Sequence, residues 1–160
     1  MVNLLPDWAP NIHPLVIHFP IAWWIAAVIV DLVALILPRA AWANATASTL
    51  YPAGAVSAAV AYLTGRRAAA TVLTPGMAHA LVLQHWNWAL VTTVSFGLIA
   101  LLRVWVSFAH PQPPRWVRKV LTAAALAALV SLFETGERGA RLVFEHGLGV
   151  STAGVVSPKQ

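Results

Sequence analysis

Histidine is the residue of this chain best suited to cofactor chemistry, because a neutral imidazole can ligate haem iron, copper or zinc. The chain has six histidines, of which four form two close pairs and two stand alone: His13 with His18, His79 with His85, His110, and His146. Cysteine is absent, which excludes thiolate metal sites and the CxxCH attachment of c-type haem. Any metal or haem in this chain must therefore use ligands other than cysteine.

The composition indicates which elements position these histidines. The chain has 160 residues, of which 59% are hydrophobic and only 9% are charged, and its mean hydropathy is +0.74. A helix that spans a bilayer needs about 20 apolar residues, so four spans and short connections use nearly the whole chain. We expect an all-α, antiparallel four-helix transmembrane bundle, formed as one domain over residues 1–160, with both termini on the same side of the membrane.

The four expected spans cover residues of about 14–37, 48–64, 80–102 and 117–140. A proline opens the first span and another follows it, as is typical of helix boundaries. The second span consists largely of small residues, which permit close contact between helices in lipid. Two arginines and a Pro-Gly pair are expected to end it, and a polar, proline-rich segment over residues 103–116 is expected to connect the third span to the fourth. The fourth helix could continue to Phe144.

This topology places five of the six histidines at one end of the bundle. Two lie at the start of the first span, two lie at the start of the third, and one follows the fourth: His13, His18, His79, His85 and His146. His110 lies alone in the opposite connection. Polar groups at membrane depth are costly and tend to face the bundle interior, so the grouping favours a shared site.

Depth along each helix separates the five histidines into two sets. With a rise of about 1.5 Å per residue, His18 lies about 7 Å deeper than His13, and His85 lies about 9 Å deeper than His79. We therefore predict that His18 and His85 form the buried pair, as axial ligands of a haem or as copper or zinc ligands. The shallower His13, His79 and His146 could form a second site, with His13 and His146 as the favoured pair. Paired histidines on one helix are turned about 120 to 140° apart, so each helix could serve two sites.

The few charged residues near the spans have simpler expected roles. Glu145, beside His146, could hold a histidine tautomer as an outer partner. Asp31, toward the far end of the first span, is expected to pair with a base such as Arg103. The remaining charged residues of the fourth helix have the spacing of helix salt bridges: Glu134, Glu137, Arg138 and Arg141.

Three segments carry a resemblance to a known family. They are IHPLVIHFPIA (Ile12 to Ala22), QHWNWAL in the third span, and LVFEHGLGV (Leu142 to Val150). From about Asn11 to Val150 the chain resembles the small integral membrane family classed as domain of unknown function 2231. The resemblance implies a four-helix membrane domain with recurrent histidines that acts as a b-type cytochrome, and related domains occur attached to c-type cytochrome modules. It assigns cofactor binding to His13, His18, His85 and His146. It assigns no role to His79.

The leading hypothesis is a membrane b-type cytochrome that transfers single electrons through histidine-ligated haem b, one or two per chain. Its partner would be a redox protein such as a c-type cytochrome or a larger membrane complex. The alternatives are a copper or zinc binding or transport protein that uses the same histidines, and a non-redox membrane scaffold subunit. A stand-alone enzyme is not favoured, since the chain shows no Ser-His-acid constellation and no nucleotide-binding loop. Nucleic-acid binding is not expected, because the bases do not form one stripe.

Basic residues indicate the orientation in the membrane. The far end carries five bases and the histidine end carries five: Arg39, Arg103, Arg115, Arg118 and Lys119 against Arg66, Arg67, Arg138, Arg141 and Lys159. Those of the far end lie in tight loops next to helix ends, where they influence orientation most. We therefore expect an integral protein of a bacterial inner membrane, with its histidine end extracytoplasmic.

Overall fold

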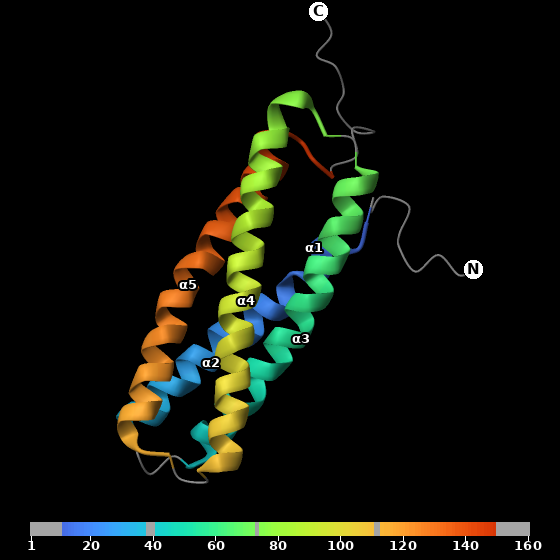
Figure 1. Cartoon of the computed structure of the whole chain (residues 1–160). Coiled ribbons are helices and arrows are strands. Elements are labelled where there is room, and N and C mark those ends of the chain that lie inside the picture. The colour runs from blue at the N-terminus through green and yellow to red at the C-terminus, as the bar shows by residue number, and fades with distance from the viewer. Residues whose placement is uncertain (1–10, 38–40, 73, 111–112, 150–160) are drawn as a thin grey trace, which may run out of the picture.

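The computed structural model describes residues 11–37, 41–72, 74–110 and 113–149, and in these ranges helices are the only regular elements. A short helix, four long helices and one 3-10 turn follow each other along the chain: α1 (His13–Val16), α2 (His18–Ile36), α3 (Ala41–Thr71), η1 (Gly76–Ala78), α4 (His79–Ala109) and α5 (Arg115–Phe144). Figure 1 shows the long helices side by side as one elongated bundle. The prediction of an all-α, four-helix fold is confirmed.

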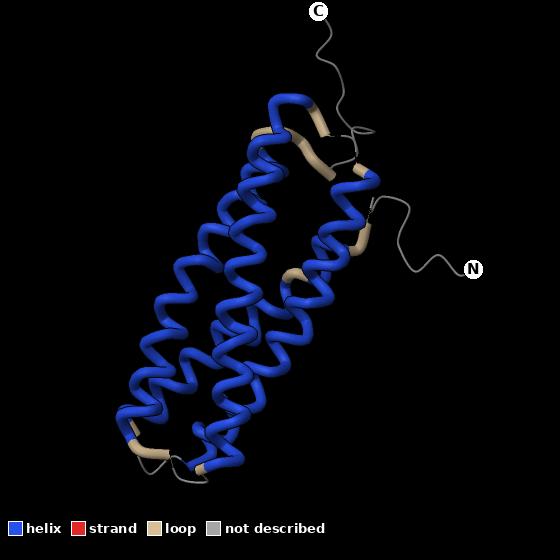
Figure 2. The backbone as a smooth tube through the Cα atoms, in the orientation of Figure 1, coloured by secondary structure: helices blue, strands red, loops and turns tan. Residues whose placement is uncertain are grey.

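The four long helices pack in a ring, each against two neighbours. Along the chain, α2 packs against α3, α3 against α4 and α4 against α5, and α5 in turn contacts α2. Successive long helices run antiparallel, so the start of α1, the end of α3, the start of α4 and the end of α5 share one end of the bundle (Figures 1 and 2). We call this the histidine end and the opposite end the far end. The described chain begins and finishes at the histidine end, as the sequence predicts.

A proline interrupts the first span near its start. Pro20 has no N–H to donate to the carbonyl of Val16, and its ring crowds that carbonyl. The helix accordingly breaks at Ile17, which separates α1 from α2. Pro14 opens α1, where a missing N–H costs nothing.

Three of the long helices, α3, α4 and α5, are longer than the predicted spans. Arg66 and Arg67, expected to end the second helix, lie inside α3, which continues to Thr71. The segment after Leu102, expected as a connection, remains helical to Ala109. Arginine is a good helix former, so a basic residue marks the membrane surface without ending the helix. Gly136 and Gly139 do not stop α5 either, which reaches Phe144.

Three segments of the described chain are long and apolar enough to cross a membrane: His13–Ile36, Gly76–Ala109 and Arg115–Phe144. Helix α3, which contains the second expected span, is not among them because it is rich in small and polar residues. It is nevertheless the fourth member of the bundle. Large apolar side chains such as Ile36, Leu101 and Phe133 point outward and remain exposed. An exterior of this kind suits lipid and not water.

An aromatic layer fills the core. The three largest fully buried side chains are Trp24 of α2, Tyr51 of α3 and Phe96 of α4. The rings of Trp24 and Phe96 stack with centroids 4.3 Å apart and planes inclined by 11°, and the ring of Tyr51 lies 6.4 Å from that of Phe96. A Cβ at position 54 would overlap the Trp24 ring, so Gly54 is what lets α3 approach α2 here.

A buried polar cluster lies on the far-end side of this layer. Arg103 of α4 pairs with Asp31 of α2, as the sequence predicts, and the two residues are only 5% and 3% exposed. The Tyr51 hydroxyl donates to Oδ2 of Asp31 at 2.9 Å, and the Arg103 guanidinium lies 4.5 Å from the centroid of the Tyr51 ring. Three helices are therefore joined through one carboxylate.

Candidate functional site

His13 stands at the start of α1 and contacts α3. Its Nδ1 lies 3.2 Å from Oγ1 of Thr64. The Thr64 hydroxyl donates its own proton to the carbonyl oxygen of Ala61 at 2.9 Å, so Oγ1 acts as the acceptor from His13. The proton of the neutral imidazole therefore resides on Nδ1, and Nε2 carries a free lone pair.

His85 shows the same arrangement on the other side of the bundle. It lies on α4, half-buried, and its Nδ1 is 2.9 Å from the carbonyl oxygen of Thr135 on α5. A carbonyl oxygen can only accept, so Nδ1 of His85 also carries the proton. Its Nε2 is therefore the atom that is available as a ligand.

Two glycines let these imidazoles contact neighbouring helices. A Cβ added at Gly65 of α3 would lie 2.9 Å from Cε1 of His13, and one added at Gly139 of α5 would lie 3.2 Å from Cε1 of His85. Each ring thus packs directly on a helix backbone. Gly139, which the sequence suggested as a weak point of the last helix, has a packing role.

His13 and His85 lie at the same end of the bundle and are held in the same way. They come from α1 and α4, whose starts both lie at the histidine end (Figure 1). Both rings are fixed through Nδ1 by groups of this chain. An Nδ1–H held by a protein acceptor, with Nε2 left for the metal, is the usual arrangement of a ligating histidine.

His18 does not lie in this site. It is exposed, and its Nδ1 is 3.3 Å from the carbonyl oxygen of Leu15 in its own helical segment. The neighbouring Leu15 and Phe19 are also exposed. A separation of five residues turns a helical side chain by about 140°, so an inward His13 directs His18 outward. The expected burial of His18 is therefore not found, because depth along the helix does not determine which face a residue occupies. The role of His18 as a ligand beside His85 stays a prediction.

The other histidines lie apart from the pair. His79 is exposed, with Nδ1 3.3 Å from the carbonyl oxygen of Gly76 in the preceding turn. His146 is half-buried just after α5, and His110 is exposed at the far end. Within the described ranges, no three residues among His, Cys, Asp and Glu are grouped so that they could hold a metal ion. The second site expected from His13, His79 and His146 stays a prediction.

The motif around His146 has a conformational explanation. Gly147 and Gly149 adopt positive φ angles of 65° and 73°, which favour glycine. The N–H of Leu148 donates to the carbonyl oxygen of Leu142 at 3.0 Å, so the chain turns back over the end of α5. Leu148 then packs on a small apolar cluster that includes Ala78.

The charged residues of α5 pair with each other, as predicted. Glu145 contacts Nε of Arg141 at 2.9 Å, and no hydrogen bond to His146 is found in the described chain. Arg138 pairs with Glu134, and Arg141 lies 3.7 Å from Glu137. The possible role of Glu145 in orienting a histidine is therefore not supported by its contacts.

Two arginines lie beside tryptophans that follow His85 on α4. The guanidinium of Arg66 is 5.5 Å from the centroid of the Trp86 ring, and that of Arg138 is 5.3 Å from that of Trp88. The indole N–H of Trp86 also donates to the hydroxyl of Tyr62. The tryptophans of two cation–aromatic pairs therefore lie on α4 within three residues of His85.

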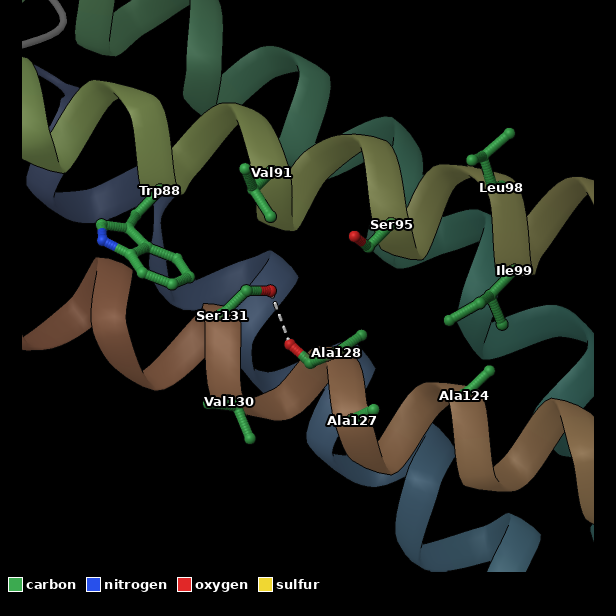
Figure 3. Close-up of a pocket in the computed structure, with 10 residues that line it drawn as sticks. All are labelled: Trp88, Val91, Ser95, Leu98, Ile99, Ala124, Ala127, Ala128, Val130 and Ser131. Carbon is green, nitrogen blue, oxygen red and sulfur yellow. Dashed lines mark hydrogen bonds between the residues drawn. The ribbon is translucent and has the colours of Figure 1, made fainter.

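A separate groove lies between α4 and α5 (Figure 3). Its volume is about 520 Å³, and its lining is mostly small and apolar, from Trp88 at one end to Leu98 and Ala124. The Ser131 hydroxyl in this lining donates to the carbonyl oxygen of Ala128 at 2.7 Å. No histidine lines the groove, so it is distinct from the histidine site.

Comparison with known protein families decides the classification. Residues 9–152 match the family described as "Predicted membrane protein (DUF2231)". The chain belongs to this family. No curated protein and no solved structure matches it. Family membership and the three apolar helices together establish a membrane protein that contacts the lipid bilayer.

Sequence reasoning missed the residues that fix the two imidazoles. Gly65 and Gly139 have no functional group, Thr64 is one of many hydroxyl residues, and the carbonyl of Thr135 has no signature in the sequence. A small residue on a membrane helix at the depth of a histidine is the signal that could have indicated them, since only a small residue admits a ring against the backbone.

Proposed function

We propose that this chain is a membrane b-type cytochrome in which His13 and His85 supply the two axial imidazoles of one haem b. The observation that carries this proposal is that the two imidazole rings have the same tautomer and the same kind of hydrogen bond. Each gives its Nδ1 proton to an acceptor of the chain, at 3.2 Å and 2.9 Å, and each keeps Nε2 for a metal.

The donor set favours haem over zinc. A structural zinc site usually takes four protein ligands and a catalytic site three. Haem iron receives four nitrogens from its own macrocycle and needs two from the protein. A pair of imidazoles from α1 and α4 therefore suffices for haem, whereas it is an incomplete set for zinc.

The chain's own residues would prepare the site for electron transfer. Haem bound by two histidines supplies one-electron oxidation and reduction without an open position for substrate. Thr64 and the Thr135 carbonyl hold the ring orientations and make Nε2 more basic. Gly65 and Gly139 keep the rings close to α3 and α5, and the guanidinium of Arg66 adds positive charge that would favour an acidic group of the cofactor.

An absorption spectrum of the detergent-solubilised protein, oxidised and then reduced, tests the proposal. We expect a low-spin b-type spectrum with one haem per chain. Copper or zinc in stoichiometric amount without haem would favour a metal-binding protein instead, and a colourless, metal-free protein would favour a scaffold subunit. The His18→Ala variant distinguishes the two candidate pairs. It should keep the spectrum if His13 and His85 are the ligands, and lose it if His18 and His85 are.

The setting we propose is a bacterial inner membrane with the histidine end extracytoplasmic. Electrons would pass between a membrane or extracytoplasmic donor and a redox partner such as a c-type cytochrome or a larger membrane complex. The distribution of bases supports this orientation, because Arg115, Arg118 and Lys119 lie within the first five residues of α5 at the far end. A reporter that works only outside the cytoplasm should be active when it is fused to the C-terminus. A C-terminal fusion that was active only in the cytoplasm would reverse the orientation.

A further inference from the structure

The far end of the bundle combines an apolar groove with unbalanced positive charge. The groove has a volume of about 350 Å³ and lies between the end of α4 and the start of α5. Its walls include Leu102, Trp105 and Val106 on one side and Trp116, Val117 and Val120 on the other. It is separate from the histidine site at the opposite end.

The groove opens toward lipid at the level of the membrane surface. Trp105 is 64% exposed and Trp116 is 67% exposed, and both line the groove. Tryptophan prefers the boundary between headgroups and acyl chains, where one edge of the ring is wet and the rest is apolar. The exposed apolar residues Leu102 and Val120 lie nearer the membrane centre. A molecule in this groove would therefore have a polar head at the surface and an apolar chain below it.

Two bases near the start of α5 adjoin lining residues in the sequence, although neither base lines the groove itself. Arg115 and Lys119 are exposed and lie four residues apart, on one face of α5 next to the lining residues Trp116 and Val120. Arg118 is directed elsewhere, since its Nη2 donates to the carbonyl oxygen of Ala34 at 2.8 Å. From α4, the exposed His110 lines the same groove and adds an imidazole.

The acidic residues of the described chain do not balance these cations. The sequence has five acids, of which Asp7 lies outside the described residues. Glu134, Glu137 and Glu145 lie at least 15 residues beyond Lys119, toward the histidine end. Asp31 is the acid at the far end, and Arg103 and Tyr51 already bind it. The ion pairs of the described chain include neither Arg115 nor Lys119.

We propose that this groove is a binding site for one anionic phospholipid. Arg115 and Lys119 bind the phosphate, His110 contacts the headgroup from α4, and an acyl chain lies between Trp105 and Val120. The proposal commits to an anionic lipid because the bases require negative charge and the walls require a hydrocarbon chain. Each base near an anionic headgroup favours binding by about fivefold. This site does not depend on haem.

Native mass spectrometry of the purified full-length protein, with added phosphatidylglycerol or phosphatidylcholine of equal chain length, tests the site. We expect one phosphatidylglycerol to be retained and phosphatidylcholine to be lost. Arg115→Gln and Lys119→Gln should each lower retention about fivefold, and the double variant about 25-fold. Arg67→Gln removes an exposed base at the opposite end and should leave retention unchanged. Val120→Trp fills the groove without altering charge and should also expel the lipid.

Circular dichroism of each variant should match the original protein, because the changed side chains are exposed. Glycerol phosphate, which lacks acyl chains, should not bind. This control distinguishes a site for a lipid from a site for a free phosphate. Equal retention of both lipids, or undiminished retention in the double variant, would overturn the proposal. The proposal would also be overturned if the original protein formed a dimer without bound lipid and Val120→Trp abolished that dimer. The groove would then be an interface between two copies.

Discussion

Arg103 of α4 and Asp31 of α2 form an ion pair inside the bundle, and the hydroxyl of Tyr51 donates to the same carboxylate oxygen at 2.9 Å. A charged residue within a membrane bundle is costly unless it meets a partner. The pair and the hydroxyl join α2, α3 and α4, which come from distant parts of the chain. The cluster lies about 27 Å along α4 from His85, so its role is in helix assembly and not in the histidine site.

Breaking this pair should destabilise the fold. Asp31→Asn or Arg103→Gln leaves one buried charge without its partner, and we expect a loss of about 3 to 5 kcal/mol in the free energy of unfolding. Tyr51→Phe removes one hydrogen bond and should cost about 1 kcal/mol. Unfolding of the protein in detergent, followed by circular dichroism, measures all three. Single charge variants as stable as the original protein would contradict a structural role for the pair.

The contact between Gly54 and Trp24 gives a second test of the core. Gly54→Ala introduces a methyl group that overlaps the Trp24 ring, so α2 and α3 must separate. We expect a loss of about 1 to 3 kcal/mol despite the higher helix propensity of alanine. Gly97→Ala is the matched control, because a Cβ there meets open space, and it should leave stability unchanged or slightly higher. If the two variants had the same unfolding temperature, the close approach at Gly54 would be refuted.

Glycine substitutions at the histidine end should act on haem and not on the fold. A Cβ at Gly65 presses on Cε1 of His13, and one at Gly139 presses on Cε1 of His85. Displacing a ligand by a few tenths of an ångström weakens an axial bond, so we expect less bound haem or a high-spin spectrum in Gly65→Ala and, to a smaller degree, in Gly139→Ala. Gly136→Ala, on the same helix but facing open space, should keep the original spectrum. An unchanged spectrum in Gly65→Ala would count against His13 as a ligand.

The hydroxyl of Thr64 gives a test of ring orientation. Thr64→Val keeps the size of the side chain but removes the acceptor for Nδ1 of His13. Loss of such an outer partner commonly lowers metal affinity about 10-fold to 100-fold, and we expect haem affinity to fall to that extent. Thr64→Ser should restore it. On the same helix, the hydroxyl of Thr71 bonds only to helix carbonyls, so a titration with haem should find no change in Thr71→Val.

The fold could be predicted from the sequence because it follows from composition. Long apolar segments separated by proline and basic residues leave few alternatives to a membrane bundle. The pairing of Asp31 with Arg103 was predictable for the same reason, since a buried acid needs a base at its own depth. Helix ends were less predictable, because Arg66 and Arg67 suit a helix as well as a membrane surface.

The site was predictable in its location but not in its membership. Antiparallel topology brings His13, His18, His85 and His146 to one end, and the sequence indicates this. Which ring faces inward depends on the rotation of each helix, and α1 is set apart by the break at Ile17. The partners of the rings come from residues about 50 positions away, as Thr64 does for His13 and Thr135 for His85, and no local pattern records such contacts.

The spectrum of three alanine variants tests the central claim most directly. We predict that the purified, dithionite-reduced protein shows one low-spin b-type haem, that His13→Ala and His85→Ala each abolish that signal or convert it to a high-spin form, and that His18→Ala leaves it unchanged. Haem content per chain should be measured in the same samples. A normal low-spin signal in His13→Ala together with its loss in His18→Ala would contradict the account and would restore His18 with His85 as the axial pair.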